Sequence, residues 1–250
     1  MTKTFINLSS EECAEVYPSI IKNSDDHFNI AHILQENSHY GSAVSHLVLG
    51  SEELVKALIM FFDGIGLKLR QTDGVSRFFR NHKSRHYLST IIQIISVFVI
   101  TPVMEIATTY KSITLSKKNI SKMNDFERAL FGVDEKESEL LISRWAKKLA
   151  ESSKPLIDFW DEADYFKQQG FYVDYENRLI APTQIKKADY IIALKATSRF
   201  REDCKKLINY FVNLTLKEKN AFISFANSNE RFKKTIDDLF SESLRQIKRR

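Results

Sequence analysis

Residues 43–62 read AVSHLVLGSEELVKALIMFF, and this stretch decides the fold. Its apolar and small residues recur at intervals of three and four, the spacing that places side chains on one face of an α-helix. The members of this face are Ala43, Val44, Leu47, Val48, Ser51, Leu54, Val55, Leu58, Ile59 and Phe62. A helix with so continuous a stripe must bury it against other elements, so we predict a core helix that ends at Gly64 and Gly66.

A second long helix is predicted immediately before this one, from about Ser10 to Asn37. Its start signal is a serine at residue 9 or 10 followed by two glutamates, because a serine hydroxyl caps the first free amides of a helix. Pro18 either kinks this helix or separates a short first turn. Residues 37–41, NSHYG, predict a tight connection, and we therefore expect the two helices to pair antiparallel.

The whole chain is predicted to be all-α, because it has only 7 Gly and 4 Pro and few stretches alternate with a period of two. After a polar linker at residues 111–124, further helices are predicted near residues 124–131, 135–152, 154–169, 184–213, 216–226 and 230–248. Residues 170–177 break the helical period and are expected to form a short extended loop, after which Pro182 restarts the helical pattern. We expect a core domain, residues 1–182, and a C-terminal helical extension, residues 183–250, packed on it.

The composition excludes several classes of protein. Hydrophobic residues make up 43% of the chain and aromatic residues 12%, too many for a disordered chain. Cys13 and Cys204 are far apart and form neither a disulfide framework nor a CxxC metal motif, which indicates a reducing compartment. Residues 1–11 lack the apolar run of a signal peptide, so we expect a cytoplasmic protein.

Residues 87–107 form the only stretch that resembles a membrane span. The stretch approaches the ~20 residues that cross a bilayer, but polar residues and a proline interrupt it. These are Ser89, Thr90, Gln93, Ser96, Thr101, Pro102 and Glu105. We therefore predict a buried core helix and no membrane partner, while the alternative of a membrane effector predicts that the protein pellets with membranes.

Residues 80–86, RNHKSRH, carry the side chains most suited to chemistry. His82 and His86 are one helical turn apart, and imidazoles titrate near neutral pH, so either can move a proton. The Arg80 guanidinium can stabilise charge on a phosphate, and Asn81 can position that phosphate or cap the helix start. This set suits RNA cleavage in which the 2′-hydroxyl attacks phosphorus and a 2′,3′-cyclic phosphate forms, without a metal or other cofactor.

The local charge favours a nucleic-acid partner more than the formal net charge of +5 does. Between Asp63 and His86 there are six basic residues and two acidic ones, a local excess of four.

Two other interpretations of residues 80–86 stay open. His-x-x-x-His is also a metal-ligand spacing, although a hydrolytic site needs a third protein ligand, for which Asp73 or Glu53 is the nearest candidate. The basic run can also be a solvated helix start.

A second row of residues follows another face of the helix predicted at residues 43–62. It comprises His46, Gly50, Glu53 and Ala57. Small residues in this row would let another helix approach closely, and Glu53 would then orient the basic cluster. In the alternative, Glu52, Glu53 and Lys56 form surface ion pairs worth about 0.3–0.5 kcal/mol each.

Three blocks of sequence, in order, resemble the AbiV abortive-infection family. The first lies within residues 31–57 and ends in GSEELVKA, which is similar to the Glu-Glu-x-x-Lys-Ala block that closes the second helix of that family. The second, FRNHKSRH at residues 79–86, resembles its His-centred basic motif, with Arg85 where a lysine is common. The third, GFYVDY at residues 170–175 followed by Pro182, is similar to its Tyr-Val-Asp block.

The AbiV family is in turn similar to the HEPN superfamily. The ribonucleases of that superfamily carry an arginine and a histidine separated by four to six residues. Arg80 to His86 has five intervening residues and Arg77 to His82 has four, so the catalytic register stays open. The resemblance implies a HEPN-like helical bundle with additional C-terminal helices, acting as a homodimer whose two motifs share one RNA-cleaving cleft. It implies catalytic roles for Arg80, Asn81, His82 and His86, RNA binding by Arg77, Lys83 and Arg85, and an orienting role for Glu53.

The resemblance thus predicts a bacterial phage-defence effector, a metal-independent endoribonuclease and toxin. Such a toxin must be silent in healthy cells, which implies a phage-encoded activator protein or a dimer rearrangement. The alternative is a non-catalytic HEPN-like scaffold that binds RNA or a protein. Arg85 keeps the positive charge, but its planar guanidinium binds phosphate through two parallel hydrogen bonds. A role that needs the amine of a lysine would therefore be lost.

Overall fold

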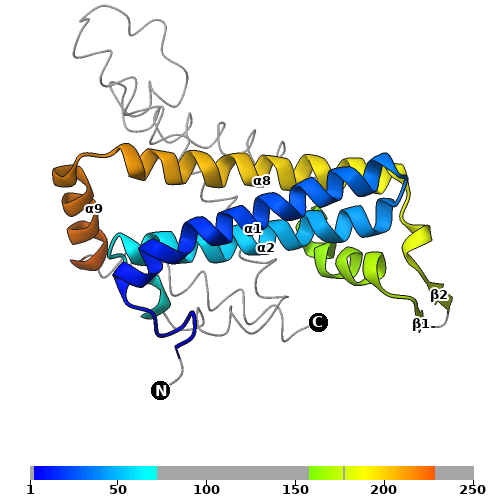
Figure 1. Ribbon diagram of the computed structural model, residues 1–250, viewed down its shortest axis with the longest axis horizontal. Helices are drawn as coiled ribbons and strands as arrows, with labels where there is room; N and C mark the ends of the chain where they lie inside the picture. The colour runs from blue at the N-terminus through cyan, green and yellow to red at the C-terminus, as the bar shows by residue number, and fades with distance from the viewer. Residues whose placement is uncertain (1–2, 72–157, 177, 229–250) are drawn as a thin grey trace, which may run out of the picture. The chain divides into compact units, whose positions relative to one another are not determined.

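The computed structural model describes residues 3–71, 158–176 and 178–228 (Figure 1). The chain divides into two compact units, Met1–Ile91 with Asp158–Arg250, and Ile92–Ile157. All the described residues belong to the first unit, and the structure below is that of this unit.

Helix α1 spans Ser10–Glu36 and begins where the serine signal predicted. Ser9 is the N-cap: its hydroxyl accepts a hydrogen bond from the Glu12 amide at 3.2 Å, and the Glu12 carboxylate accepts one from the Ser9 amide at 2.8 Å. This capping box satisfies two amides that would otherwise lack a helical partner. The helix continues through Pro18 as one element, so no separate first turn forms.

Helix α2 spans Tyr40–Gly64, and its predicted apolar face forms the centre of the core. Every predicted member of that face except Phe62 is buried. Burial of each large aliphatic side chain contributes about 1.5–3 kcal/mol, so this face contributes strongly to the stability of the described helices. Ser38, with a φ of 61°, supplies the left-handed residue that lets the chain reverse between α1 and α2.

Helices α1 and α2 lie side by side and antiparallel, as predicted (Figure 1). Their contacts run in opposite directions along the two helices: Tyr17 with Phe61, Ser24 with Gly50, and His27 with His46. The two helices approach closely at Gly50, where a Cβ atom would lie 2.9 Å from the ring of Phe28. The small-residue row of α2 is therefore covered at Gly50 by α1 of the same chain.

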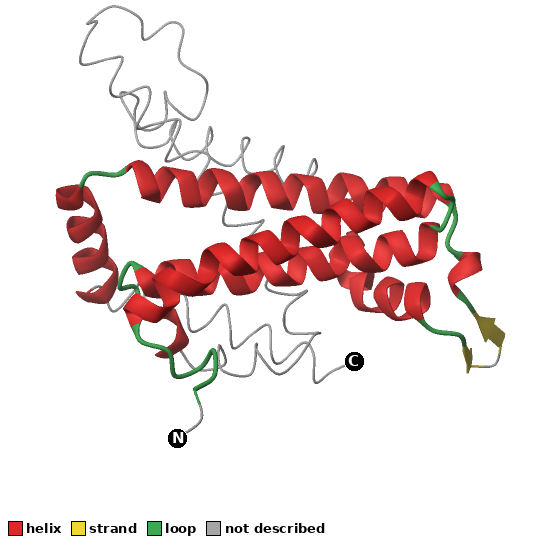
Figure 2. Cartoon of the chain, in the orientation of Figure 1, coloured by secondary structure: helices red, strands yellow, loops and turns green. Residues whose placement is uncertain are grey.

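Helix α8, Lys187–Asn213, packs along α2 and runs parallel to it (Figure 2). Aromatic ring pairs at both ends set this alignment: Tyr40 with Tyr190, and Phe62 with Phe211. Helix α9, Leu216–Ser228, follows after a short connection. The helices predicted at residues 184–213 and 216–226 are thus confirmed, with small shifts at their ends.

A further helical segment, residues 158–171, confirms the helix predicted at 154–169 within the described range and ends against the start of α2. Gly170 makes this packing possible, because a Cβ on this residue would overlap the Ser45 hydroxyl and the Gly41 carbonyl oxygen. The Ser45 hydroxyl donates a hydrogen bond of 2.8 Å to the carbonyl of Lys167. The glycine that opens the Tyr-Val-Asp block is therefore needed for close helix packing.

The residues predicted as an extended loop form a small β-hairpin. Strand β1, Asp174–Glu176, pairs antiparallel with β2, Arg178–Ile180, with Tyr175 opposite Leu179. The restart predicted at Pro182 is the short 3-10 helix η4, Pro182–Gln184, and α8 itself begins three residues later. An aromatic and an aliphatic side chain paired across the strands stabilise such a hairpin.

The predicted all-α class is confirmed, and the hairpin is the β structure within the described ranges. Cys13 and Cys204 are both buried, and each is a free thiol. No helix in the described part of the chain has both the length and the apolarity to cross a membrane. The stretch at residues 87–107 and the helices predicted at 124–131, 135–152 and 230–248 lie outside the described residues.

Candidate functional site

All but one of the predicted site residues lie outside the described residues. These are Arg77, Arg80, Asn81, His82, Lys83, Arg85 and His86, together with the alternative metal ligand Asp73. Their roles, and the choice between the two arginine–histidine registers, therefore stay predictions. The structure describes Glu53 and the pair of helices that precedes the basic segment.

Glu53, which we predicted to orient the basic cluster, forms an ion pair with Lys56 one turn further along α2. The two side chains are 17% and 16% exposed, so solvent still screens the pair. This is the i,i+3 pair of the alternative interpretation. The orienting role stays a prediction, because the basic cluster lies outside the described residues.

Glu52, the neighbour of Glu53, is a buried residue, and its predicted place in a surface pair is wrong. Its side chain is 1% exposed, and its Oε1 lies 2.7 Å from Nζ of Lys167, which is 5% exposed. Asp164 Oδ1 lies 3.3 Å from the same Nζ. The helical period could have shown this, because Glu52 lies one turn from both Val48 and Val55 within the buried stripe.

His27 on α1 and His46 on α2 form an imidazole pair that the sequence did not reveal. Their Nδ1 atoms are 3.0 Å apart, and both side chains are partly buried. The ring of Phe171, at the end of the helix of residues 158–171, packs edge-on against His46 with centroids 5.4 Å apart. The pair therefore joins three helical segments at one point of the bundle.

The environment of this pair favours the neutral imidazoles. Burial lowers the pKa of His27, an effect that the Glu53 carboxylate partly opposes and the Lys56 ammonium reinforces. Burial also lowers the pKa of His46, and the neighbouring His27 lowers it further. At neutral pH both rings are therefore uncharged, with one lone pair each for a proton or another ligand.

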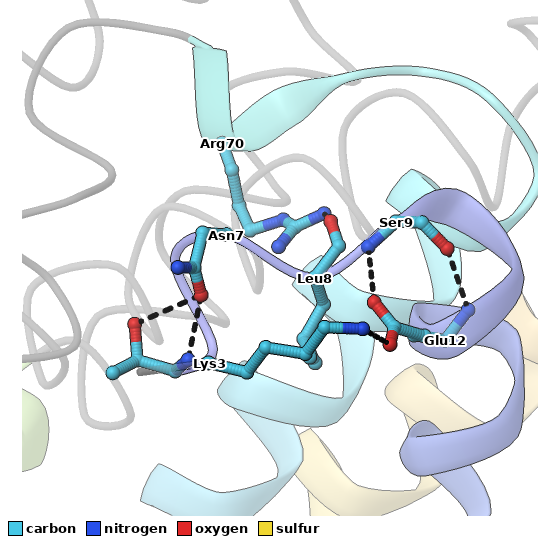
Figure 3. Close-up of polar contacts among 7 residues, drawn as sticks. Lys3, Asn7, Leu8, Ser9, Glu12 and Arg70 are labelled. Carbon is cyan, nitrogen blue, oxygen red and sulfur yellow. Dashed lines mark hydrogen bonds and ion pairs between the residues drawn. The ribbon is translucent and has the colours of Figure 1, made fainter. Parts of the chain in front are cut away.

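Arg70 anchors the last described residues before the basic segment. The Arg70 guanidinium forms an ion pair with the Asp63 carboxylate, which is 3% exposed, and donates hydrogen bonds to the carbonyls of Phe5 at 2.7 Å and Leu8 at 2.8 Å. Figure 3 shows this guanidinium beside the chain that leads into the capping box at Ser9. Residue 70, seven positions before Arg77, is thus fixed to both α2 and the N-terminal segment.

No group of three or more His, Cys, Asp or Glu side chains that could hold a metal ion occurs within residues 3–71, 158–176 and 178–228. Glu53 therefore does not complete a three-residue site with the two histidines. In the alternative in which Glu53 and the His-x-x-x-His motif share a metal, both histidines of the motif lie outside the described residues.

A comparison with protein families gives a match that covers most of the chain. The family model HEPN_AbiV, described as AbiV, matches residues 12–202, well over half of the 250-residue chain. No curated protein and no solved structure matches the chain. The matched range includes all three blocks quoted from the sequence, and it extends through the first half of α8, beyond the point near Pro182 where the resemblance ended.

Proposed function

The chain belongs to the AbiV family of HEPN-type abortive-infection proteins, and from this premise we propose that it is a homodimeric, metal-independent endoribonuclease of bacterial phage defence. HEPN domains are often ribonucleases. The observation that carries the proposal is the position of the Arg-Asn-His-Lys-Ser-Arg-His segment within the matched residues 12–202.

The described helices support this proposal as a packed frame that reaches residue 70, seven positions before Arg77. The long antiparallel pair α1 and α2 is buried along its contact, and the ion pair of Asp63 and Arg70 holds the chain at the end of that frame. Catalytic groups need such support, because a displacement of about 1 Å can cost ~100-fold in rate. The ion pair uses one acid and one base of this stretch, so the formal basic excess of four, which would attract RNA, is unchanged.

In the proposed reaction, one histidine removes the 2′-hydroxyl proton and the attack on phosphorus expels the 5′-oxygen, leaving a 2′,3′-cyclic phosphate. His86 or His82 serves as the base or the acid, and Arg80 stabilises the charge on the nonbridging oxygens. Asn81 positions the phosphate. Arg77, Lys83 and Arg85 bind the flanking phosphates, and a phage-encoded protein activates the enzyme.

The experiment that tests this function is incubation of the purified protein with total RNA in excess chelator, followed by analysis of the fragment ends. We expect fragments that end in 2′,3′-cyclic phosphate, and light scattering should give the mass of a dimer. Binding of RNA without fragments, in the presence and absence of infected-cell extract, would favour the non-catalytic scaffold.

Single variants separate the two registers. Loss of cleavage by about 10²–10⁴-fold in Arg80→Ala and His86→Ala, but not in Arg77→Ala and His82→Ala, would assign the longer spacing. His32→Ala is the matched control, because its imidazole on α1 is 67% exposed and lies outside the motif. Circular dichroism should show the same helicity in all five variants.

A further inference from the structure

We propose that His27 and His46 form a binding site for a divalent transition-metal ion, such as Zn²⁺, Ni²⁺ or Cu²⁺, that links α1 to α2. The site uses none of the residues of the proposed RNA-cleaving motif. It is therefore independent of the proposed function and compatible with cleavage that needs no metal.

The distance between the two histidines fits one metal ion. A metal bound at about 2.0–2.1 Å by two imidazole nitrogens separates them by about 2.9 Å at a right angle and about 3.3 Å at the tetrahedral angle. The Nδ1 atoms of His27 and His46 are 3.0 Å apart, between these two values. Imidazole suits zinc, copper and nickel, whereas magnesium and calcium prefer oxygen.

The electrostatics of the pair also require a cation or a proton between the rings. Two neutral imidazoles that both carry their proton on Nε2 would direct two lone pairs at each other across 3.0 Å. One of them must therefore hold a proton on Nδ1, or a metal ion must accept both lone pairs.

The surroundings indicate an exchangeable site rather than a closed structural one. Within the described residues no third ligand joins the two histidines, so water would fill the remaining positions. Both imidazoles are partly exposed, so water and ions can reach them.

The test must separate this pair from the four other histidines of the chain. His82 and His86 have a metal-ligand spacing of their own, so the parent protein is the full chain with His82→Ala and His86→Ala. Cu²⁺ is added to this parent at pH 7.5, and binding is measured by titration and by electron paramagnetic resonance. We expect one ion per chain with two nitrogen ligands.

Removal of either ligand should weaken binding of Cu²⁺ at least ~10-fold, because loss of even an outer partner of a metal-bound histidine costs ~10–100-fold. His27→Gln and His46→Gln are measured in the parent, and His32→Gln and His39→Gln serve as matched controls with unchanged affinity. A parent without a two-nitrogen signal, or His27→Gln with the affinity of the parent, would overturn the proposal and leave the pair as a shared-proton contact. If His27→Gln does not fold, His46→Gln and the metal-dependent rise in the unfolding temperature of the parent decide the question.

Discussion

Replacement of Lys167 by methionine tests whether a buried ion pair holds the helix of residues 158–171 on α2. The Lys167 ammonium lies 2.7 Å from Oε1 of Glu52, and the two side chains are 5% and 1% exposed. Methionine keeps the apolar stem but removes the charge, so the Glu52 carboxylate loses the ammonium that it contacts in the interior. Breaking a buried pair from one side typically costs about 3–5 kcal/mol.

For a chain of this size, that loss corresponds to a fall of about 6–20 °C in the unfolding temperature. The measurement is urea unfolding at 25 °C, followed by far-ultraviolet circular dichroism. Lys56→Met is the matched control, because its pair with Glu53 is 16–17% exposed and should contribute only about 0.2–1 kcal/mol. The double variant Lys167→Met with Glu52→Gln should recover much of the loss, since it removes the fully buried carboxylate, while Asp164, the other carboxylate beside Lys167, is 25% exposed. Equal costs for Lys167→Met and Lys56→Met would refute the reasoning.

Three further predictions concern packing, pH and thiol reactivity. Gly170→Ala should lower the free energy of unfolding by about 1–3 kcal/mol or more, because the added methyl group would overlap a backbone carbonyl of α2. An unchanged urea midpoint would contradict this close helix contact. Burial lowers the pKa of both His27 and His46 from 6.5, so the unfolded chain binds more protons than the folded chain near that pH. Stability should therefore fall as the pH drops below 6.5, and urea unfolding midpoints between pH 5 and 8 measure this fall. Burial raises the pKa of Cys13 and raises that of Cys204 well above its usual value, so a thiol reagent should modify both slowly in the native protein and rapidly in denaturant.

The pH prediction has an internal control. The charged groups that act on His27 are Glu53, Lys56, Asp26 and Glu52, and His27 in turn acts on His46. Changing both histidines to glutamine should flatten the dependence on pH near 6, whereas His32→Gln should leave it unchanged because that imidazole is 67% exposed. If stability still depends on pH near 6 in the double variant, other titratable groups cause that dependence.

Local sequence signals determined the helical frame of this protein. The capping serine fixed the start of α1, the apolar repeat at three and four fixed the buried face of α2, and the short polar connection required the two helices to be antiparallel. The blocks that resemble the AbiV family also determined its membership, which the match over residues 12–202 confirms. Each of these signals acts within a few residues or is a pattern along one element, so it can be seen without the fold.

Tertiary structure alone decided which polar residues meet. Glu52 and Glu53 are adjacent and chemically identical, but a rotation of about 100° between neighbouring helix positions buries one against Lys167 and leaves the other paired with Lys56. His27 and His46 meet because the close contact of α1 at Gly50 sets the register of the two helices. Such partners are 19 to 115 residues apart, and their contact depends on packing that no local pattern encodes.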